Sequence, residues 1–197
     1  MKRFTIVATA VFVIAGTGLT FTDEGGRRFR EFLNGFKEAT TVVSTTGTGR
    51  FGATISKDEG EINYVLTFKD LEGDVRQAHI HIGHPQNQGG IVLWLCESDT
   101  NPNPDPIAPT PACTMDNPMD ARAGRVTGTL TADDVQNQPG NGIAGAPATT
   151  PGEFEEVIAL IRAGKTYVNV HSSKFTGGEI RSQINDPLGD RDEHHHD

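Results

Sequence analysis

The chain has 197 residues, of which 35% are hydrophobic and 23 are glycine, so wholesale disorder is excluded and one ordinary domain is expected. Its net charge of −9 argues against a nucleic-acid-binding protein, because such proteins present a basic surface to phosphates. Two cysteines are too few for a disulfide-dense scaffold.

The first 22 residues have the pattern of an export signal. Lys2 and Arg3 precede a mostly apolar stretch at 4–21, and no charge follows until Asp23. We expect a signal peptide that is cleaved; the alternative is a membrane anchor over 4–21, which has about the minimum length for crossing a bilayer. A core helix fits less well, because the segment has no polar face. In either exported form the remaining chain is secreted, periplasmic or at the cell surface.

From residue 28 onward the sequence predicts a series of short strands. Turn signals such as Lys57-Asp58-Glu59-Gly60 separate segments with alternating or continuous apolar residues. This spacing predicts an all-β domain at 29–185, an antiparallel Greek-key sandwich or barrel of about eight strands. The expected strands are Arg28–Leu33, Thr48–Ser56, Glu61–Phe68, Val75–Ile82, Ile91–Leu95, Arg125–Leu130, Thr166–Ser172 and Glu179–Ile184.

Cys96 and Cys113 flank a segment that is rich in proline. Proline fixes φ and lacks a backbone donor, so residues 97–112 are expected to form a loop rather than a strand or a helix. In an oxidising compartment the two cysteines can form a structural disulfide; two free thiols are the alternative.

One helix is expected at about 152–163. Thr150, Pro151 and Glu153 form a start signal, with a capping side chain, proline at the first helical position and glutamate at the third. Apolar residues then recur at helical spacing, and Gly164 is placed to end the helix. We expect this helix to pack across one opening or edge of the sheet.

Two histidines alternate with isoleucines in the strand expected at 75–82. Residues two apart in a strand point to the same face. Ile80 and Ile82 are therefore assigned to the core, and His79 and His81 to the outer face.

The strand expected at 166–172 repeats this pattern. Its two valines are assigned to the core, which leaves Tyr167, Asn169 and His171 on the outer face. If the two strands are neighbours, three imidazoles meet on the outer surface.

A group formed by His79, His81 and His171 suits copper or zinc, for which imidazole is a good ligand. His84, just past the strand, is either a fourth ligand or a loop residue. The expected arrangement has the histidines hydrogen-bonded to their neighbours, where they organise a surface pocket without a metal, and the metal site is the alternative.

The last strand places Glu179 and Arg181 on the outer face, near the histidines. We expect Arg181 to form a cross-strand ion pair with Glu179 or another carboxylate. The alternative is that it attracts an anion near the histidines.

The C-terminal residues 186–197 are acidic and contain His194, His195 and His196. We expect a disordered, solvated tail; loose capture of a divalent metal is the alternative.

Two separated motifs, with the helix between them, resemble the CHRD (chordin-type) domain. The first is Ala78–Ile82 with the glycines that follow it, and the second is Tyr167–His171 followed by Gly178–Arg181. The resemblance runs from about 29 to 184. It implies a secreted or cell-surface β-sandwich with no established enzymatic activity, and the longer proline-rich insertion here is expected to be a variable surface loop.

A fainter likeness is to copper-zinc superoxide dismutase, in which an HxH strand and a later strand hold copper outside a Greek-key barrel. His79, His81 and His171 match those three positions, and the likeness implies a copper site. Nothing matches the bridging histidine or the zinc ligands, since no histidine lies between His84 and His171.

Three functions follow from these features. The expected one is a non-enzymatic extracellular module that binds another envelope or extracellular protein, with no nucleic acid and with membrane contact only through 4–21. The second is a copper- or zinc-binding protein using His79, His81 and His171. The third is a dismutase-like enzyme, which ranks last because turnover needs a defined ligand shell with an open position.

Overall fold

The predicted export signal and C-terminal tail both lie outside the part of the chain that the computed structural model describes. Within that part, no helix is long and apolar enough to cross a membrane. The described residues are 27–39, 41–104, 106, 108–114, 119–146 and 152–185.

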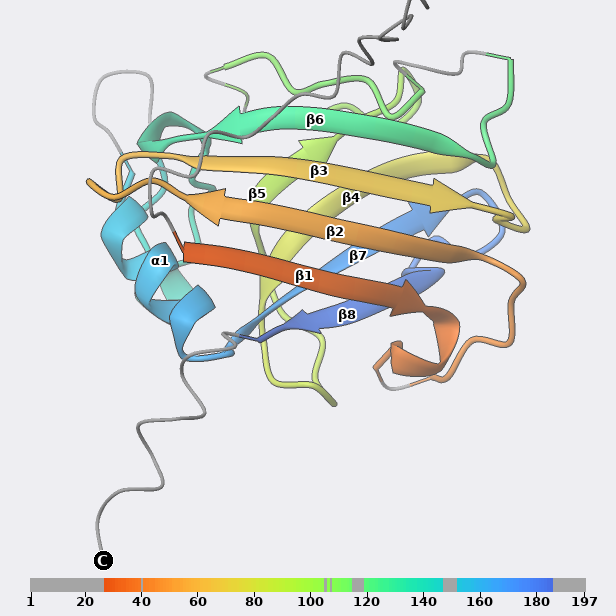
Figure 1. The fold of residues 1–197 in the computed structure, drawn as a ribbon, viewed down its shortest axis with the longest axis horizontal. Helices are drawn as coiled ribbons and strands as arrows, with labels where there is room; N and C mark the ends of the chain where they lie inside the picture. Colours follow the sequence, from red (N-terminus) through yellow and green to blue (C-terminus); the bar gives the residue numbers. More distant parts are fainter. Residues whose placement is uncertain are drawn as a thin grey trace, which may run out of the picture.

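All eight predicted strands form, and they join in one antiparallel sheet with the order β5-β4-β7-β8-β1-β2-β3-β6 (Figure 1). Glu179, predicted to begin the last strand, lies one residue before it. The strands are β1 (Arg27–Asn34), β2 (Thr48–Ile55), β3 (Ile62–Lys69), β4 (Val75–Ile82), β5 (Ile91–Cys96), β6 (Gly124–Leu130), β7 (Thr166–Ser172) and β8 (Ile180–Ile184).

The sheet curls into a nearly closed barrel made of two four-stranded halves. β1 and β8 share a single residue pair, Asn34 with Arg181, so the sheet turns sharply there. In Figure 1, β1, β2, β3 and β6 form the front half, and β4, β5 and β7 cross behind them. The apolar core fills the space between the halves, with Leu66 from one and Val168 from the other fully buried. This arrangement confirms the predicted all-β class.

The predicted helix forms as α1 (Phe154–Arg162), and its start differs from the expectation. Glu153 is the N-cap residue, and its ψ of 73° is not helical, so α1 begins at Phe154. The backbone N–H of Gly152 donates to Ala132 and that of Glu153 donates to Ala144. Thr150 and Pro151 lie outside the described residues. Phe154, Val157, Ile158 and Ile161 are the residues that α1 buries in the core at one end of the sheet.

The end of α1 confirms the role predicted for Gly164. This glycine has φ +63°, its N–H donates to Ile161, and the N–H of Lys165 donates to Leu160. That pair of bonds is a Schellman motif, which satisfies carbonyls at the end of the helix.

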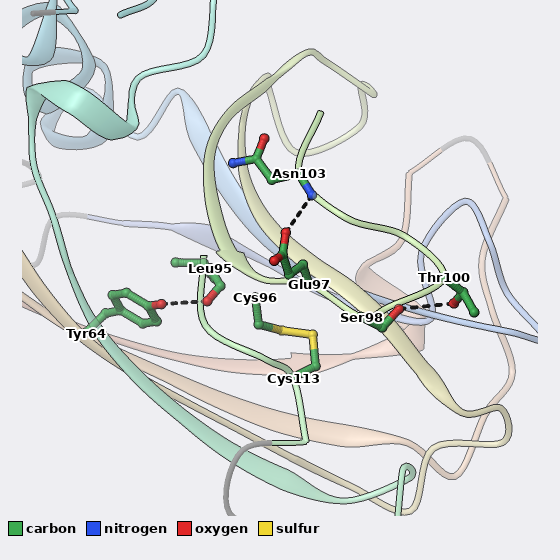
Figure 2. The surroundings of a disulfide bond; sticks show 8 residues. All are labelled: Tyr64, Leu95, Cys96, Glu97, Ser98, Thr100, Asn103 and Cys113. Carbon is green, nitrogen blue, oxygen red and sulfur yellow. Dashed lines mark hydrogen bonds between the residues drawn. A yellow bond between two sulfur atoms is a disulfide. The ribbon is translucent and has the colours of Figure 1, made fainter. Parts of the chain in front are cut away.

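Cys96 and Cys113 form the predicted disulfide, and both are buried (Figure 2). Beside it, Glu97 pairs with Ala112 in an isolated bridge, and the Glu97 carboxylate accepts a hydrogen bond from the backbone of Asn103 at 2.6 Å. The disulfide therefore closes the proline-rich loop against the end of β5.

Replacing both cysteines by alanine should lower the free energy of unfolding by about 3 kcal/mol, because the loop of 17 residues becomes free in the unfolded chain. Urea denaturation of the two proteins measures the difference. Wild-type protein treated with a reductant serves as the control and should unfold at the same urea concentration as the Cys96→Ala/Cys113→Ala variant. An unchanged midpoint in both cases would show that the bond contributes nothing.

Candidate metal centre

Strands β4 and β7 are neighbours in the sheet. The three histidines are expected to meet only if these two strands are adjacent. Their register pairs His79 with Asn169 and His81 with Tyr167, and it places His171 opposite Gln77. His171 is thus diagonal to His79 across the ladder, within reach of a side chain on the same face.

The three histidines form a compact cluster. One ring nitrogen from each of His79, His81 and His171 lies within 4.8 Å of the other two. The ring centroids are 5.3 Å apart for His79 and His81, 5.0 Å for His79 and His171, and 6.1 Å for His81 and His171. Imidazole–zinc bonds are about 2.0–2.1 Å long, so nitrogens at this separation can converge on one ion.

The cluster lies on the face opposite the core, as predicted, and yet it is not on the outer surface. His79, His81 and His171 are 0%, 6% and 7% exposed. The chain after β4 and the chain after β7 fold over the rings, so that the carbonyls of Gly89 and Thr176 reach them. Strand alternation alone cannot reveal such a cover.

Two of the rings are oriented by backbone carbonyls. His81 Nδ1 lies 2.9 Å from the oxygen of Gly89, and His171 Nδ1 lies 2.9 Å from the oxygen of Thr176. A carbonyl only accepts, so each Nδ1 carries a proton, and the neutral ring of His81 keeps the lone pair of its Nε2. Metal-binding histidines are commonly oriented in this way.

The remaining nitrogens have few partners. Both nitrogens of His79 and the Nε2 of His81 are buried and make no hydrogen bond. His171 Nε2 lies 3.1 Å from Asn169 Oδ1. Buried polar atoms are normally satisfied, so these orphaned nitrogens point to a missing binding partner inside the cluster.

Burial keeps all three imidazoles uncharged at neutral pH. Loss of solvation lowers the pKa of His79 well below its usual value, and it also lowers that of His171. The pKa of His81 is lowered to about 4, chiefly by burial. Neutral imidazole is the form that binds a metal.

Aromatic rings surround two of the histidines. The ring of Trp94 on β5 meets His79 edge-on with centroids 4.3 Å apart, and that of Tyr167 stacks on His81 at 4.7 Å. These contacts fix both imidazoles and exclude water from them.

Arg181 closes this aromatic stack, with partners other than the predicted Glu179. Its guanidinium lies 3.4 Å from the Tyr167 ring centroid, and its Nη2 donates to the carbonyls of His84 and Asn87, each at 3.0 Å. Arg181 is 1% exposed, and these two hydrogen bonds hold the loop after β4 in place. The side chain of His84 is exposed and is not part of the cluster.

Glu38 is the carboxyl group that interacts electrostatically with Arg181. It is buried, its Oε1 has no hydrogen-bond partner, and burial raises its pKa to about 7 against the opposing effect of Arg181. Gly178 has φ +128°, and a Cβ there would lie 2.6 Å from Glu38 Oε1 and 2.8 Å from Asn169 Nδ2. Glycine is therefore required where this loop crosses the carboxyl group.

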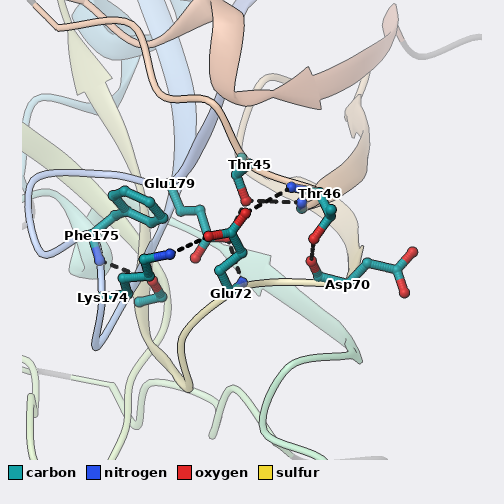
Figure 3. A network of polar contacts seen from close by, with 9 residues as sticks. Thr45, Thr46, Asp70, Glu72, Lys174, Phe175 and Glu179 are labelled. Carbon is teal, nitrogen blue, oxygen red and sulfur yellow. Dashed lines mark hydrogen bonds and ion pairs between the residues drawn. The ribbon is translucent and has the colours of Figure 1, made fainter.

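Glu179 fastens the loop that covers His171 (Figure 3). Its fully buried carboxylate accepts from Thr45 Oγ1 at 2.6 Å and from the backbone of Glu72 at 2.7 Å. The side chain of Glu72 in turn pairs with Lys174. The turn after β7 is thus tied to two loops that lie far from it in the sequence.

The residues present fit a copper or zinc ion. Three neutral imidazoles converge, two are oriented by carbonyls, and the buried lone pairs lack partners. Imidazole suits both metals, and oxygen-preferring ions such as magnesium and calcium would find no carboxylate within the cluster of described residues.

Comparison with known proteins gives one match. The family model of the CHRD domain covers residues 29–184, from β1 to the end of β8. The chain belongs to the CHRD-domain family. No curated protein and no solved structure matches it. CHRD domains are typically extracellular and non-enzymatic modules, and the disulfide is compatible with secretion.

Two residues at the site had no role in the sequence analysis. Trp94 could have been found, because alternation in β5 places it on the face opposite Leu93 and Leu95, and β5 pairs with β4. Glu38 matches the acidic residue that precedes a threonine-rich stretch in the CHRD pattern, but no role at the site followed from that match. It follows a short 3₁₀ turn in a loop and reaches the site only through the fold.

Glu38→Gln should make the metal-free CHRD domain more stable at pH 8, by about 3 kcal/mol, and should leave its stability unchanged below about pH 4.5. The folded pKa is raised to about 7, so wild-type stability falls as pH rises from 4.5 through 7, and the neutral amide escapes this loss. Urea denaturation at both pH values, with a chelator present, measures the effect. Equal stability of both proteins at pH 8 would contradict the desolvation of this carboxylate in the folded protein.

Proposed function

We propose that this CHRD domain is an exported, non-enzymatic module that holds one copper ion between His79, His81 and His171. The observation that supports this most directly is the set of buried imidazole nitrogens without partners. A purely structural histidine cluster would satisfy these atoms by hydrogen bonds, because each orphaned group costs about 1–3 kcal/mol.

Copper is favoured over zinc by the number of ligands. Structural zinc is almost always four-coordinate, and the cluster supplies three nitrogens while His84 lies outside it. For a given nitrogen site, affinity for divalent ions peaks at copper. Zinc should therefore bind more weakly at the same place.

A holding role is favoured over turnover by the cover on the site. An enzyme that cycles copper needs an open coordination position that the substrate can reach. The three rings are at most 7% exposed, and the loops above them are tied down by Arg181 and Glu179. The covered site therefore favours metal holding over dismutase-like catalysis.

The loading experiment uses the chain with His194, His195 and His196 replaced by alanine, so that the tail cannot capture metal. Refolding with copper should leave one tightly held equivalent after gel filtration, measured by elemental analysis. His171→Ala should abolish retention, because only two ligands remain, and His171→Gln serves as a second variant that preserves side-chain volume. His84→Ala is the matched control and should retain a full equivalent.

Two outcomes would contradict the metal proposal. One is a failure of the well-folded protein to retain copper or zinc at micromolar concentration, and the other is an equal loss in the His84→Ala control. Rapid superoxide dismutation by the loaded protein would instead replace the holding role with the enzymatic one.

Export is the other part of the proposal, and it is supported by the sequence of residues 1–22, the disulfide and the family. Mass spectrometry of protein from its native host should find it outside the cytoplasm, with an N-terminus near residue 23. An intact Met1 in envelope fractions would identify a membrane anchor, and intact cytoplasmic protein with free thiols would contradict export.

A further inference from the structure

The outward side of β1, β2, β3 and β6 carries basic residues on a chain that is acidic as a whole. Alternation turns one set of side chains in these strands away from the core. None of the described strand residues in that set is acidic, whereas the whole chain has a net charge of −9. The basic residues in the set, here called the basic face, are Arg28, Arg30, Arg50, Lys69 and Arg125. Lys69 is ion-paired at 3.2 Å with Asp70, one residue past β3, so the proposal rests chiefly on Arg30 and Arg50.

The register brings these cations close together. Arg50 pairs with Thr67 on β3, which pairs with Arg125 on β6, so the two arginines stand about 10 Å apart across the sheet. Arg28 and Arg30 are about 7 Å apart along β1. Such separations are comparable to the Debye length in physiological salt, about 8 Å, so the local positive potentials overlap even though distant acidic residues are screened.

Small and hydroxyl-bearing residues fill the space between the cations. Gly52 lies between Arg30 and Val65 in the register, and a Cβ there would meet nothing within 4 Å. A shallow depression of about 160 Å³ lies at this point, and a second of about 190 Å³ lies beside Arg50 and Lys69. Thr48, Thr54, Asn63, Thr67, Thr127 and Thr129 are the uncharged polar residues of β2, β3 and β6 that share this side.

We propose that the basic face binds an acidic polysaccharide. Arginine and lysine pair with carboxylate or sulfate groups, and threonine and asparagine exchange hydrogen bonds with sugar hydroxyls. Both depressions are lined by residues of β1, β2 and β3. An anionic membrane is less favoured, because Phe32 is the sole large hydrophobic side chain exposed among the described residues of this face. A single-stranded nucleic acid would need several stacking rings, and Phe32 is already covered by Arg50, whose guanidinium lies 5.8 Å from the ring centroid.

This inference is independent of the proposed metal centre. The basic face lies on β1, β2, β3 and β6, whereas the histidines lie on β4 and β7 in the other half of the sheet (Figure 1). Loss of one function should therefore leave the other intact.

The test measures binding of the whole protein to immobilised polygalacturonate and dextran sulfate, with neutral dextran as the control polymer. Wild type should bind the two acidic polymers and not dextran, and raising the salt concentration should weaken binding. Arg30→Gln/Arg50→Gln should weaken binding at least tenfold. Lys165→Gln/Lys174→Gln removes the same charge from exposed positions outside these strands and should change binding less than twofold.

Circular dichroism and thermal unfolding first establish that both double variants fold like wild type. Equal weakening by the two variants would overturn the proposal, as would equal binding to dextran or no binding to either acidic polymer. Tighter binding to phosphatidylglycerol vesicles or to single-stranded DNA than to both polysaccharides would also overturn it and would assign the face to that ligand.

Discussion

Strand alternation along β4 and β7 keeps the histidine cluster apart from the hydrophobic core. Ile80 and Val168 are directed into the core, while His79 and His171 project from the other face of the same two strands. A slip of one residue in the register would exchange these sets and place the imidazoles among aliphatic side chains. The apolar residues of β4 and β7 therefore stabilise the fold and also fix the position of every candidate ligand.

The cover over the cluster costs stability, and this cost is evidence for function. Orphaned imidazole nitrogens, a carboxyl with its pKa raised to about 7 and an almost fully buried arginine lie within one small region. A domain selected only for stability would replace such groups by apolar ones. Titratable groups perturbed by burial concentrate at functional sites, and a bound ion would satisfy the nitrogens that the protein leaves without partners.

The two proposed sites use opposite properties of the same sheet. The metal centre is buried, neutral and sealed by loops, whereas the basic face is open, charged and formed by strand residues alone. The halves that carry them share one residue pair between β1 and β8. If both proposals hold, one half of the sheet would bind a polymer while the proposed metal centre stays covered in the other.

The sequence by itself determined the strands, a helix at about 152–163 that the structure places at 154–162, and the set of three histidines. It allowed the disulfide but left two free thiols as the alternative. These features depend on local periods and spacings, which are visible along the chain. The tertiary structure decided what covers the cluster and which partners Arg181 takes. The hydrogen bonds of Arg181 reach His84 and Asn87, which are 97 and 94 residues away in the sequence. Glu179 is held by Thr45, which is 134 residues away. Alternation tells which face a side chain occupies, but only the packing of distant loops determines whether that face meets water.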